Sequence, residues 1–357
     1  MEFGILFTSQ PNTEAEAYPH RDVHARVTSQ ILRADELGYD YAWLAEHHFS
    51  NEYGIMPDVF VYAGYLAALT ERIKIGTAVV TLPLANPLRV VENAAFIDIL
   101  SGGRFVLGLG SGYRQYEFDG FGIDFAGRRD VQEEALPLLM DLFLKKRIDH
   151  QGKHFRAKVD GEYEIFPHAV QQPHPPIFLA SSTERSIKVA GRMGCGMLMS
   201  SWTPFGELAR QTAAYRAAME ETPPHLRANP ARGHADVARW VYVAETDAKA
   251  KQESEEGLMR HMHHFASGHT SGYLGTVSEG GGAVRDYDGL SRDIILHGSP
   301  ATVIEKVEQL REMTGISSVM LHYPPWYGVD KTVASLEMFA TEVAPKFRPP
   351  QPARKRA

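Results

Sequence analysis

The chain has 357 residues, of which 44% are hydrophobic and 23% are charged, a composition typical of a globular protein with a sizeable core. Its net charge of −7, from 37 basic and 44 acidic residues, argues against broad affinity for nucleic acids or anionic membranes.

The single cysteine, Cys195, lies in an apolar run and predicts a buried thiol. One cysteine excludes an internal disulfide and a CxxC metal or redox motif, so we expect a reducing, cytoplasmic setting. The first residues lack the pattern of a signal peptide, and no apolar run is long enough to span a membrane.

Eight short apolar runs follow one another along the chain, and each has the length of a β-strand. Most are apolar on both faces, which is the pattern of parallel strands covered by helices. The runs occupy residues 3–8, 41–46, 73–82, 104–110, 176–181, 195–200, 239–245 and 316–323.

Helical patterns separate these runs. Segments 22–38, 89–103 and 299–315 each end at glycine, a frequent helix terminator. Segment 129–146 is also predicted to be helical, and Pro137 should kink or split it.

Eight strand runs that alternate with helices predict a (β/α)₈ TIM barrel of the α/β class, with a doubly wound sheet as the alternative. We expect one domain over residues 1–348, with a hairpin-bearing insertion at about 147–175. A second insertion, at about 266–297, is glycine-rich and resembles a loop or lid. The proline-rich, basic tail 349–357 is expected to be disordered.

Chemistry in such barrels gathers at the carboxyl ends of the strands, and the second strand runs into Glu46, His47 and His48. A histidine here can act as a general base or hold a structural hydrogen bond. Neighbouring residues of a strand point to opposite faces, so the three side chains cannot all face one site. These residues alone leave both roles open.

The run "GLGSGYR" at 108–114 follows the fourth strand and has Tyr113 where a dinucleotide fingerprint needs its third glycine. A loop rather than a helix is expected next, so we do not predict a dinucleotide-binding turn. The glycine-rich backbone can still present N–H groups to a phosphate, with a plain tight turn as the alternative.

Two further stretches are compatible with an anionic ligand. Ser181 and Ser182 follow the fifth strand and can cap the next helix or hold a phosphate. Arg128 and Arg129 begin a helix, where the helix dipole disfavours cations and a bound anion would offset that cost.

The stretch "HMHH" at 261–264 looks metal-like, because His261 and His264 share a helix face. No nearby carboxylate or cysteine pair completes a ligand set, so a solvated helix face is the better interpretation. We therefore expect no metal site.

Taken together, "DELGYDYAWLAEHHF", "IGTAVVTLP", "LSGGRFVLGLGSGYR", "FGIDFAGRR" and "PIFLASS" resemble the bacterial luciferase-like flavin monooxygenases. The resemblance covers nearly the whole chain and is closest to the catalytic-subunit pattern of the family. It implies a (β/α)₈ barrel that receives reduced FMN from a separate reductase. It further implies reaction with O₂ through a C4a-hydroperoxyflavin that oxygenates a small, largely apolar substrate.

The resemblance also implies roles for individual residues. His47 matches the catalytic histidine of the family, and His48 is assigned a structural role. Ala78–Val79 matches a non-proline cis peptide that is expected beside the flavin ring. Phosphate-binding segments of the family match Gly112, Tyr113, Arg129, Ser181 and Ser182.

Two positions depart from the family pattern. Ser111 replaces an arginine of the catalytic subunit, and we expect Arg114 to compensate in part for the lost cation. Gly110 replaces a cysteine beside the flavin and is expected to open space.

A reaction of this kind needs a closed, apolar pocket. Four aromatic residues near strand ends are predicted to line it, namely Phe7, Trp43, Trp202 and Tyr323. The alternatives are hydride transfer with F420 on the same barrel and a non-catalytic flavin-binding partner subunit. Family resemblance suggests a homodimer, and the substrate is not identified.

Overall fold

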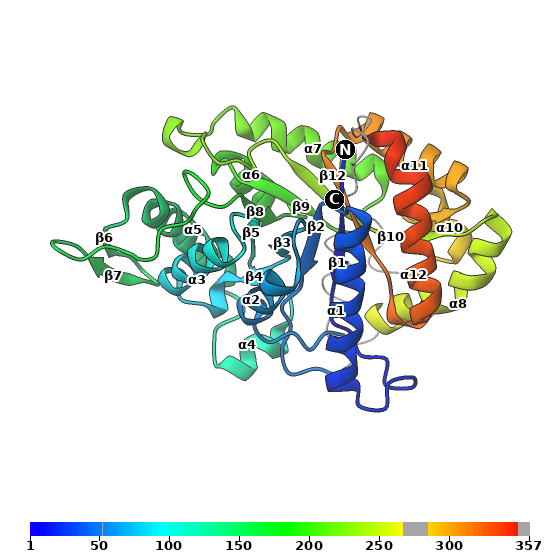
Figure 1. The fold of residues 1–357 in the computed structure, drawn as a ribbon. Helices are drawn as coiled ribbons and strands as arrows, with labels where there is room; N and C mark the ends of the chain where they lie inside the picture. Colours follow the sequence, from blue (N-terminus) through cyan, green and yellow to red (C-terminus); the bar gives the residue numbers. More distant parts are fainter. Residues whose placement is uncertain (52, 267–284, 349–357) are drawn as a thin grey trace, which may run out of the picture.

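Eight parallel strands form a closed barrel in this computed structural model, which describes residues 1–51, 53–266 and 285–348 (Figure 1). Neighbouring strands pair in the order β1-β2-β3-β5-β8-β9-β10-β12, and β12 pairs with β1 to close the ring. The predicted (β/α)₈ barrel is therefore confirmed. Its strands are β1 (Glu2–Phe7), β2 (Tyr41–Leu44), β3 (Lys74–Thr77), β5 (Phe105–Gly110), β8 (Ile177–Ala180), β9 (Gly196–Met199), β10 (Ala235–Val243) and β12 (Ser318–His322).

Two predicted strands differ most from the structure in their bounds. The third run divides into β3 and the short β4 (Val80–Thr81), which pairs with β5. The seventh strand already begins at Ala235, before the predicted start at residue 239. The sequence pattern missed its first half because the buried polar residues Asp236 and Arg239 interrupt the apolar run.

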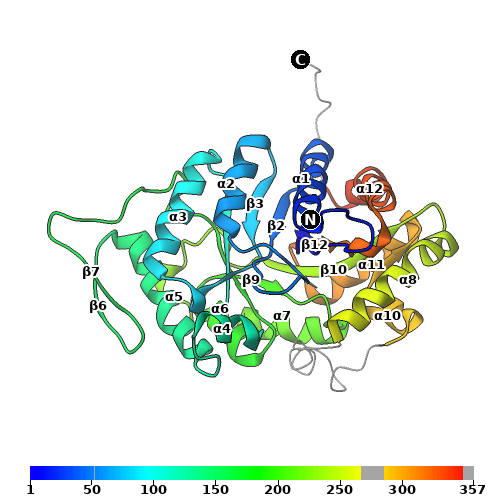
Figure 2. The same cartoon turned by 90° about the horizontal axis from the view of Figure 1, so that it is seen from below.

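Helices surround the barrel (Figure 2). Those in the chain's first half are α1 (Pro19–Leu37), α2 (Val59–Leu69), α3 (Pro87–Leu100), α4 (Gln115–Phe121) and α5 (Arg128–Lys145). The later ones are α6 (Glu184–Arg192), α7 (Phe205–Met219), α8 (Asp247–Ala266), α10 (Tyr287–Asp293), α11 (Pro300–Thr314) and α12 (Val329–Met338).

Two local predictions about helices differ from the structure. Of the predicted kink or split at Pro137, the split is absent, because α5 is continuous from Arg128 to Lys145. The glycine-rich segment after β5 leads at once into α4 rather than into a loop, and this short helix carries a residue that the site requires.

The first insertion contains the predicted hairpin, formed by the antiparallel strands β6 (Ile148–Gln151) and β7 (Arg156–Val159). The hairpin projects from the barrel (Figure 1). The carboxylate of Glu134 on α5 accepts hydrogen bonds from the N–H groups of His154 and Phe155. Within the second insertion, α10 is followed by β11 (Leu296–Gly298), which pairs with β10. Residues 267–284 and the tail 349–357 lie outside the described residues.

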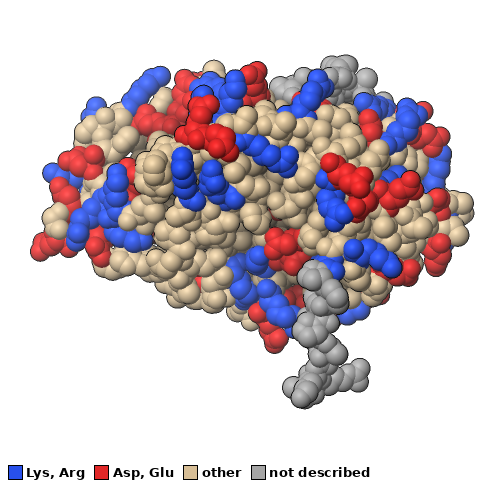
Figure 3. All heavy atoms as spheres, turned by 90° about the horizontal axis from the view of Figure 1, so that it is seen from above, with Lys and Arg blue, Asp and Glu red and all other residues tan. Residues whose placement is uncertain are grey.

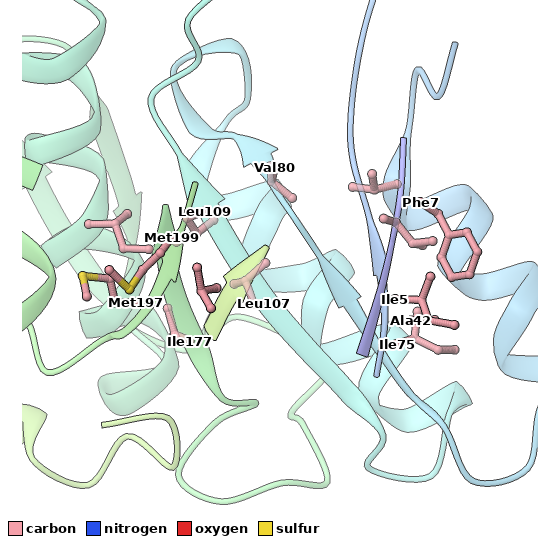
Figure 4. Close-up of a cluster of buried hydrophobic side chains, with 14 of the residues drawn as sticks. Ile5, Phe7, Ala42, Ile75, Val80, Leu107, Leu109, Ile177, Met197 and Met199 are labelled. Carbon is pink, nitrogen blue, oxygen red and sulfur yellow. The ribbon is translucent and has the colours of Figure 1, made fainter. Parts of the chain in front are cut away.

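The core has two layers. The outer layer lies between strands and helices and includes Ile5, Leu107 and Met197 (Figure 4). Inside the barrel, Trp43 and Phe178 meet edge to face with ring centroids 5.5 Å apart. Trp43 fits there because Gly76 has no side chain: a Cβ atom at Gly76 would lie 2.4 Å from the Trp43 ring. This layer fills the barrel on the amino side of the cavity described below.

On the face that Figure 3 shows, Lys and Arg lie interspersed with Asp and Glu. Among the described residues, no helix is long and apolar enough to cross a bilayer.

Candidate active site

A cavity of about 450 Å³ opens at the carboxyl ends of the barrel strands. The structure brings together here the predicted catalytic residue, every predicted cofactor-binding residue and one of the four predicted aromatic residues. These are His47, Ala78, Val79, Gly110, Ser111, Gly112, Tyr113, Arg129, Ser181, Ser182 and Trp202.

The other three predicted pocket residues do not line this cavity. Phe7 lies two residues beyond Ile5 on β1 and joins the same outward-facing cluster against the helices (Figure 4). Tyr323 continues the outward face of Leu321 beyond β12, by the same alternation. Trp43 does point into the barrel, but it belongs to the filled layer beneath the cavity. Proximity to a strand end therefore did not decide which side chains reach the site.

His47 is buried in the cavity wall and is held from two sides. Its Nδ1 lies 3.1 Å from Oε1 of Glu117 on α4, and its backbone N–H donates to the carbonyl of Met56. The same Glu117 oxygen accepts the backbone N–H of His48 at 3.0 Å. Glu117 was not predicted from the sequence. Its only signal there is its place in the first turn of the helix that follows the glycine-rich run.

The buried surroundings decide the protonation state of this pair. Burial, reinforced by the charge of Arg114, lowers the pKa of His47 to about 4 although Glu117 opposes the shift. Burial would raise the pKa of Glu117, but hydrogen bonds from His47 and His48 outweigh it and lower that pKa. Near neutral pH Glu117 is therefore a carboxylate and His47 is neutral. Because a carboxylate only accepts, Nδ1 carries the proton and Nε2 keeps a free lone pair.

His48 has a different environment. Its Nε2 lies 3.2 Å from Oε1 of Glu46, and its ring packs edge to face against Phe121. The separation of the two histidines agrees with the sequence hypothesis, but its cause differs. Both residues follow the end of β2, so the loop and Glu117 orient them rather than strand alternation.

Arg114 does not replace the cation that is absent at Ser111. Its guanidinium is buried 4.0 Å from the ring centre of Tyr53 and donates a 2.6 Å hydrogen bond to the Tyr116 hydroxyl. It does not line the cavity, although its charge acts on His47. The cavity instead receives Arg128 and Arg129 from the first turn of α5.

The polar end of the cavity combines these two arginines with the first turn of α6. Arg128 donates to the carbonyls of Gly112 and Phe125, which fixes its side chain beside the glycine-rich run. Thr183, rather than either predicted serine, caps α6 in a capping box with Ser186. Ser181 donates to the carbonyls of Leu179 and Ser186.

The wall between the polar end and His47 is built from small residues. The predicted cis peptide Ala78–Val79 is present. The prediction that Gly110 opens space was wrong: a Cβ atom at Gly110 would lie 2.5 Å from the Val79 side chain, so Val79 fills that space. Gly112 adopts a φ of 72°, and a Cβ there would clash with Phe118 and Thr81.

Two predictions outside the cavity had different outcomes. Cys195 is buried, and burial raises the pKa of its thiol to about 12, as expected for a core residue. The solvated helix face predicted for "HMHH" was wrong for His261, which is buried on α8. Among the described residues, no three His, Cys, Asp or Glu side chains are grouped to hold a metal ion.

Comparisons with known proteins give one consistent family. A family model described as luciferase-like monooxygenase matches residues 1–318. The alkanal monooxygenase alpha chain of Photorhabdus laumondii subsp. laumondii is 24% identical over 98% of this chain and 99% of its own. Limonene 1,2-monooxygenase of Rhodococcus erythropolis is 26% identical over 97% of this chain and 87% of its own. An uncharacterized protein of Sinorhizobium fredii is 33% identical, but over only 48% of each chain.

Solved structures share the fold over nearly the full chain. Monooxygenase RslO1 from Streptomyces bottropensis superposes with a TM-score of 0.82 at 22% identity, covering 98% of this chain and 100% of its own. A second structure is the oxygenating constituent of 3,6-diketocamphane monooxygenase from Pseudomonas putida, in complex with FMN. It superposes with a TM-score of 0.78 at 24% identity, covering 97% of this chain and 98% of its own. Coenzyme F420-dependent tetrahydromethanopterin reductase from Methanopyrus kandleri superposes with a TM-score of 0.69 at 20% identity, covering 97% of this chain and 99% of its own.

Replacing Glu117 by Gln tests how His47 is held. The substitution keeps an acceptor oxygen but removes the negative charge that raises the pKa of His47 against burial. We expect the pKa of His47 to fall further below about 4, as measured by NMR titration of its imidazole nitrogens. Glu46→Gln, which alters only the partner of His48, is the control. An unchanged His47 pKa in Glu117→Gln would contradict the assignment.

The depressed pKa of His47 also makes stability depend on pH. An unfolded histidine titrates near 6.5 and folded His47 near 4, so the unfolded state binds more protons between these values. This contribution lowers the free energy of unfolding as pH falls from 6.5 to 4 and adds no further loss below 4. We expect urea unfolding of His47→Gln to show a shallower decline in that window, and an equal slope would argue against a buried neutral histidine.

Proposed function

The chain belongs to the luciferase-like monooxygenase family, and from that premise we propose that it uses reduced FMN and O₂ to oxygenate a small, largely apolar organic substrate. The observation that carries this proposal is the buried His47 imidazole, held by Glu117 in a cavity that also receives two arginines.

The residues present fit FMN. A cavity of about 450 Å³ falls in the range of cofactor sites, and its lining residues give it one polar and one apolar end. Arg128, Arg129 and the hydroxyl of Ser182 offer positive charge and a donor to a phosphate near the start of α6. Gly110 and the Ala78–Val79 segment give a flat wall without long side chains for an aromatic ring system.

When bound, reduced FMN supplies the electrons that activate O₂ for transfer to the substrate. The chain itself contributes His47, whose Nε2 lone pair can accept a proton from a reacting group in the cavity. Trp202, Trp240 and Phe265 line the apolar part and exclude water from the reaction.

Hydride transfer with F420 is the second candidate, because an F420-dependent reductase shares the fold over nearly the whole chain. A non-catalytic flavin-binding subunit is the third. The deciding experiment is anaerobic titration of the pure protein with reduced FMN and, separately, with reduced F420, followed by mixing with oxygenated buffer.

We expect tighter binding of reduced FMN and an oxygen-dependent spectral phase that precedes oxidised FMN. Selective binding of F420 with no such phase would transfer the assignment to hydride transfer. Binding of FMN with no oxygen-dependent phase and no turnover in a substrate screen would favour the non-catalytic subunit.

The proposed phosphate contact at the polar end can be tested separately from binding of the flavin ring. Arg129→Ala removes one charge from the site, so we expect its Kd for reduced FMN to rise about tenfold or more. The Kd for reduced riboflavin, which lacks the phosphate, should not change. Arg185→Ala is the matched control, because Arg185 is exposed and paired with Asp130 and Glu133 outside the cavity. Equal effects on FMN and riboflavin would contradict this phosphate site.

His47→Ala tests the base. We expect turnover of an apolar aldehyde or ketone substrate, found by screening, to fall by a factor of about 10²–10⁴, the range for a lost general acid or base. The Kd for reduced FMN should stay within a few fold of the wild-type value. Turnover equal to that of the wild type would remove His47 from the mechanism.

We also propose a homodimer and a separate reductase as partners. The glycine-rich run lacks a dinucleotide fingerprint, which supports an external source of reduced flavin. Adjacent helices α2 and α3 expose Val61, Tyr65, Phe96 and Leu100, an apolar face suited to a second copy of the chain. Sedimentation velocity should give about twice the chain mass of 39.8 kDa, and a monomer at micromolar concentration would contradict the dimer.

A further inference from the structure

Two buried histidines lie close to the cavity and have no role in the proposed reaction. His322 is the last residue of β12, and His261 belongs to α8. Their ring centroids are 5.3 Å apart, and the rings are nearly perpendicular. All four ring nitrogens are buried and have no hydrogen-bond partner within the described part of the chain.

The pair lies directly behind the apolar wall of the cavity. Met320 lines the cavity, and His322 follows it by two residues on the same strand, so both side chains point to the same face. Trp240, another lining residue, pairs in register with His322 and lies 6.1 Å from its ring. Phe265 lines the cavity from the turn of α8 that follows His261.

One aromatic side chain separates the pair from the proposed base. The ring of Tyr53, which also lines the cavity, lies 4.9 Å from the ring of His47 and 6.3 Å from that of His261. A substrate that reacts beside His47 and extends along Tyr53 would therefore end at the two histidines.

The chemistry of the pair limits what it can bind. Burial lowers the pKa of His322 to about 4 and the pKa of His261 well below its usual value, so both rings are neutral near pH 7. A neutral imidazole offers one N–H donor and one acceptor nitrogen. A hydroxyl group matches this pair, because it also donates and accepts. A carboxylate only accepts and would bring a buried charge without a counter-ion.

We propose that His261 and His322 form the far end of the substrate site and bind the hydroxyl group of an alcohol-bearing apolar substrate. The inference rests on the proposed function, since it names the class of substrate for the same cavity. Neither histidine lines the cavity, so the proposal requires Phe265, which lines the cavity beside His261, to rotate aside when the ligand binds. The hydroxyl satisfies ring nitrogens whose hydrogen bonds are otherwise unmade, which favours it over an apolar group of the same shape.

The test compares toluene with benzyl alcohol, an unreactive pair that differs by one hydroxyl group. Isothermal titration calorimetry gives the ratio of their Kd values for the wild type, for the double variant His261→Leu/His322→Leu and for His263→Leu. His263 is exposed on the same helix and serves as the control. We expect the preference for benzyl alcohol to fall about tenfold in the double variant and to stay unchanged in the control.

A preference that is equal in the wild type and the double variant would overturn the proposal, since the histidines would then hold ordered water only. Absence of binding of both probes to the wild type would overturn it as well. If the double variant does not fold, His322→Leu should lose the preference and His261→Gln, which keeps a donor and an acceptor, should retain it. No flavin is added, so this result is independent of the oxygen-reaction experiment.

Discussion

The hydrogen bond between Glu117 and His47 is the interaction on which the candidate site depends. Buried imidazole is easily neutral, but a neutral ring can carry its proton on either nitrogen. An ionised carboxylate at Nδ1 removes that ambiguity and leaves Nε2 as the basic atom. The same carboxylate binds the backbone of His48, so one side chain fixes both the position and the tautomer of the base.

The barrel supplies the remaining conditions by separating polar from apolar groups within one cavity. Arginines enter from α5 at one end, where the first turn of α6 also lies. Aromatic side chains from β10, α8 and the loop after β9 form the other end. Between them, residues with little or no side chain leave a smooth wall, and packing of Trp43 against Gly76 closes the barrel beneath. The cavity therefore offers a charged end and an apolar end together, as the proposed cofactor and substrate require.

Arg239 connects this cavity to the outer core. Its guanidinium is fully buried and donates to the carbonyls of Ser200 and Thr203, which flank the loop that carries Trp202. Burial lowers its pKa to about 9, yet it remains charged near neutral pH. The backbone dipoles of this loop thus stabilise a cation, and the cation in turn fixes the wall next to the substrate end.

The sequence by itself determined the number and order of the barrel strands, because runs that are apolar on both faces are typical of a covered parallel sheet. It also determined which strand ends meet in the cavity, since parallel strands bring their carboxyl ends to one edge and family resemblance marked the segments there. It could not determine which side chains of a strand face the barrel interior. Phe7 and Tyr323 were therefore predicted to line the cavity, whereas both face outward toward the helices. Nor could it pair Glu117 with His47 across 70 residues, or bury His261 against His322, because such contacts arise only when helices dock onto the closed barrel.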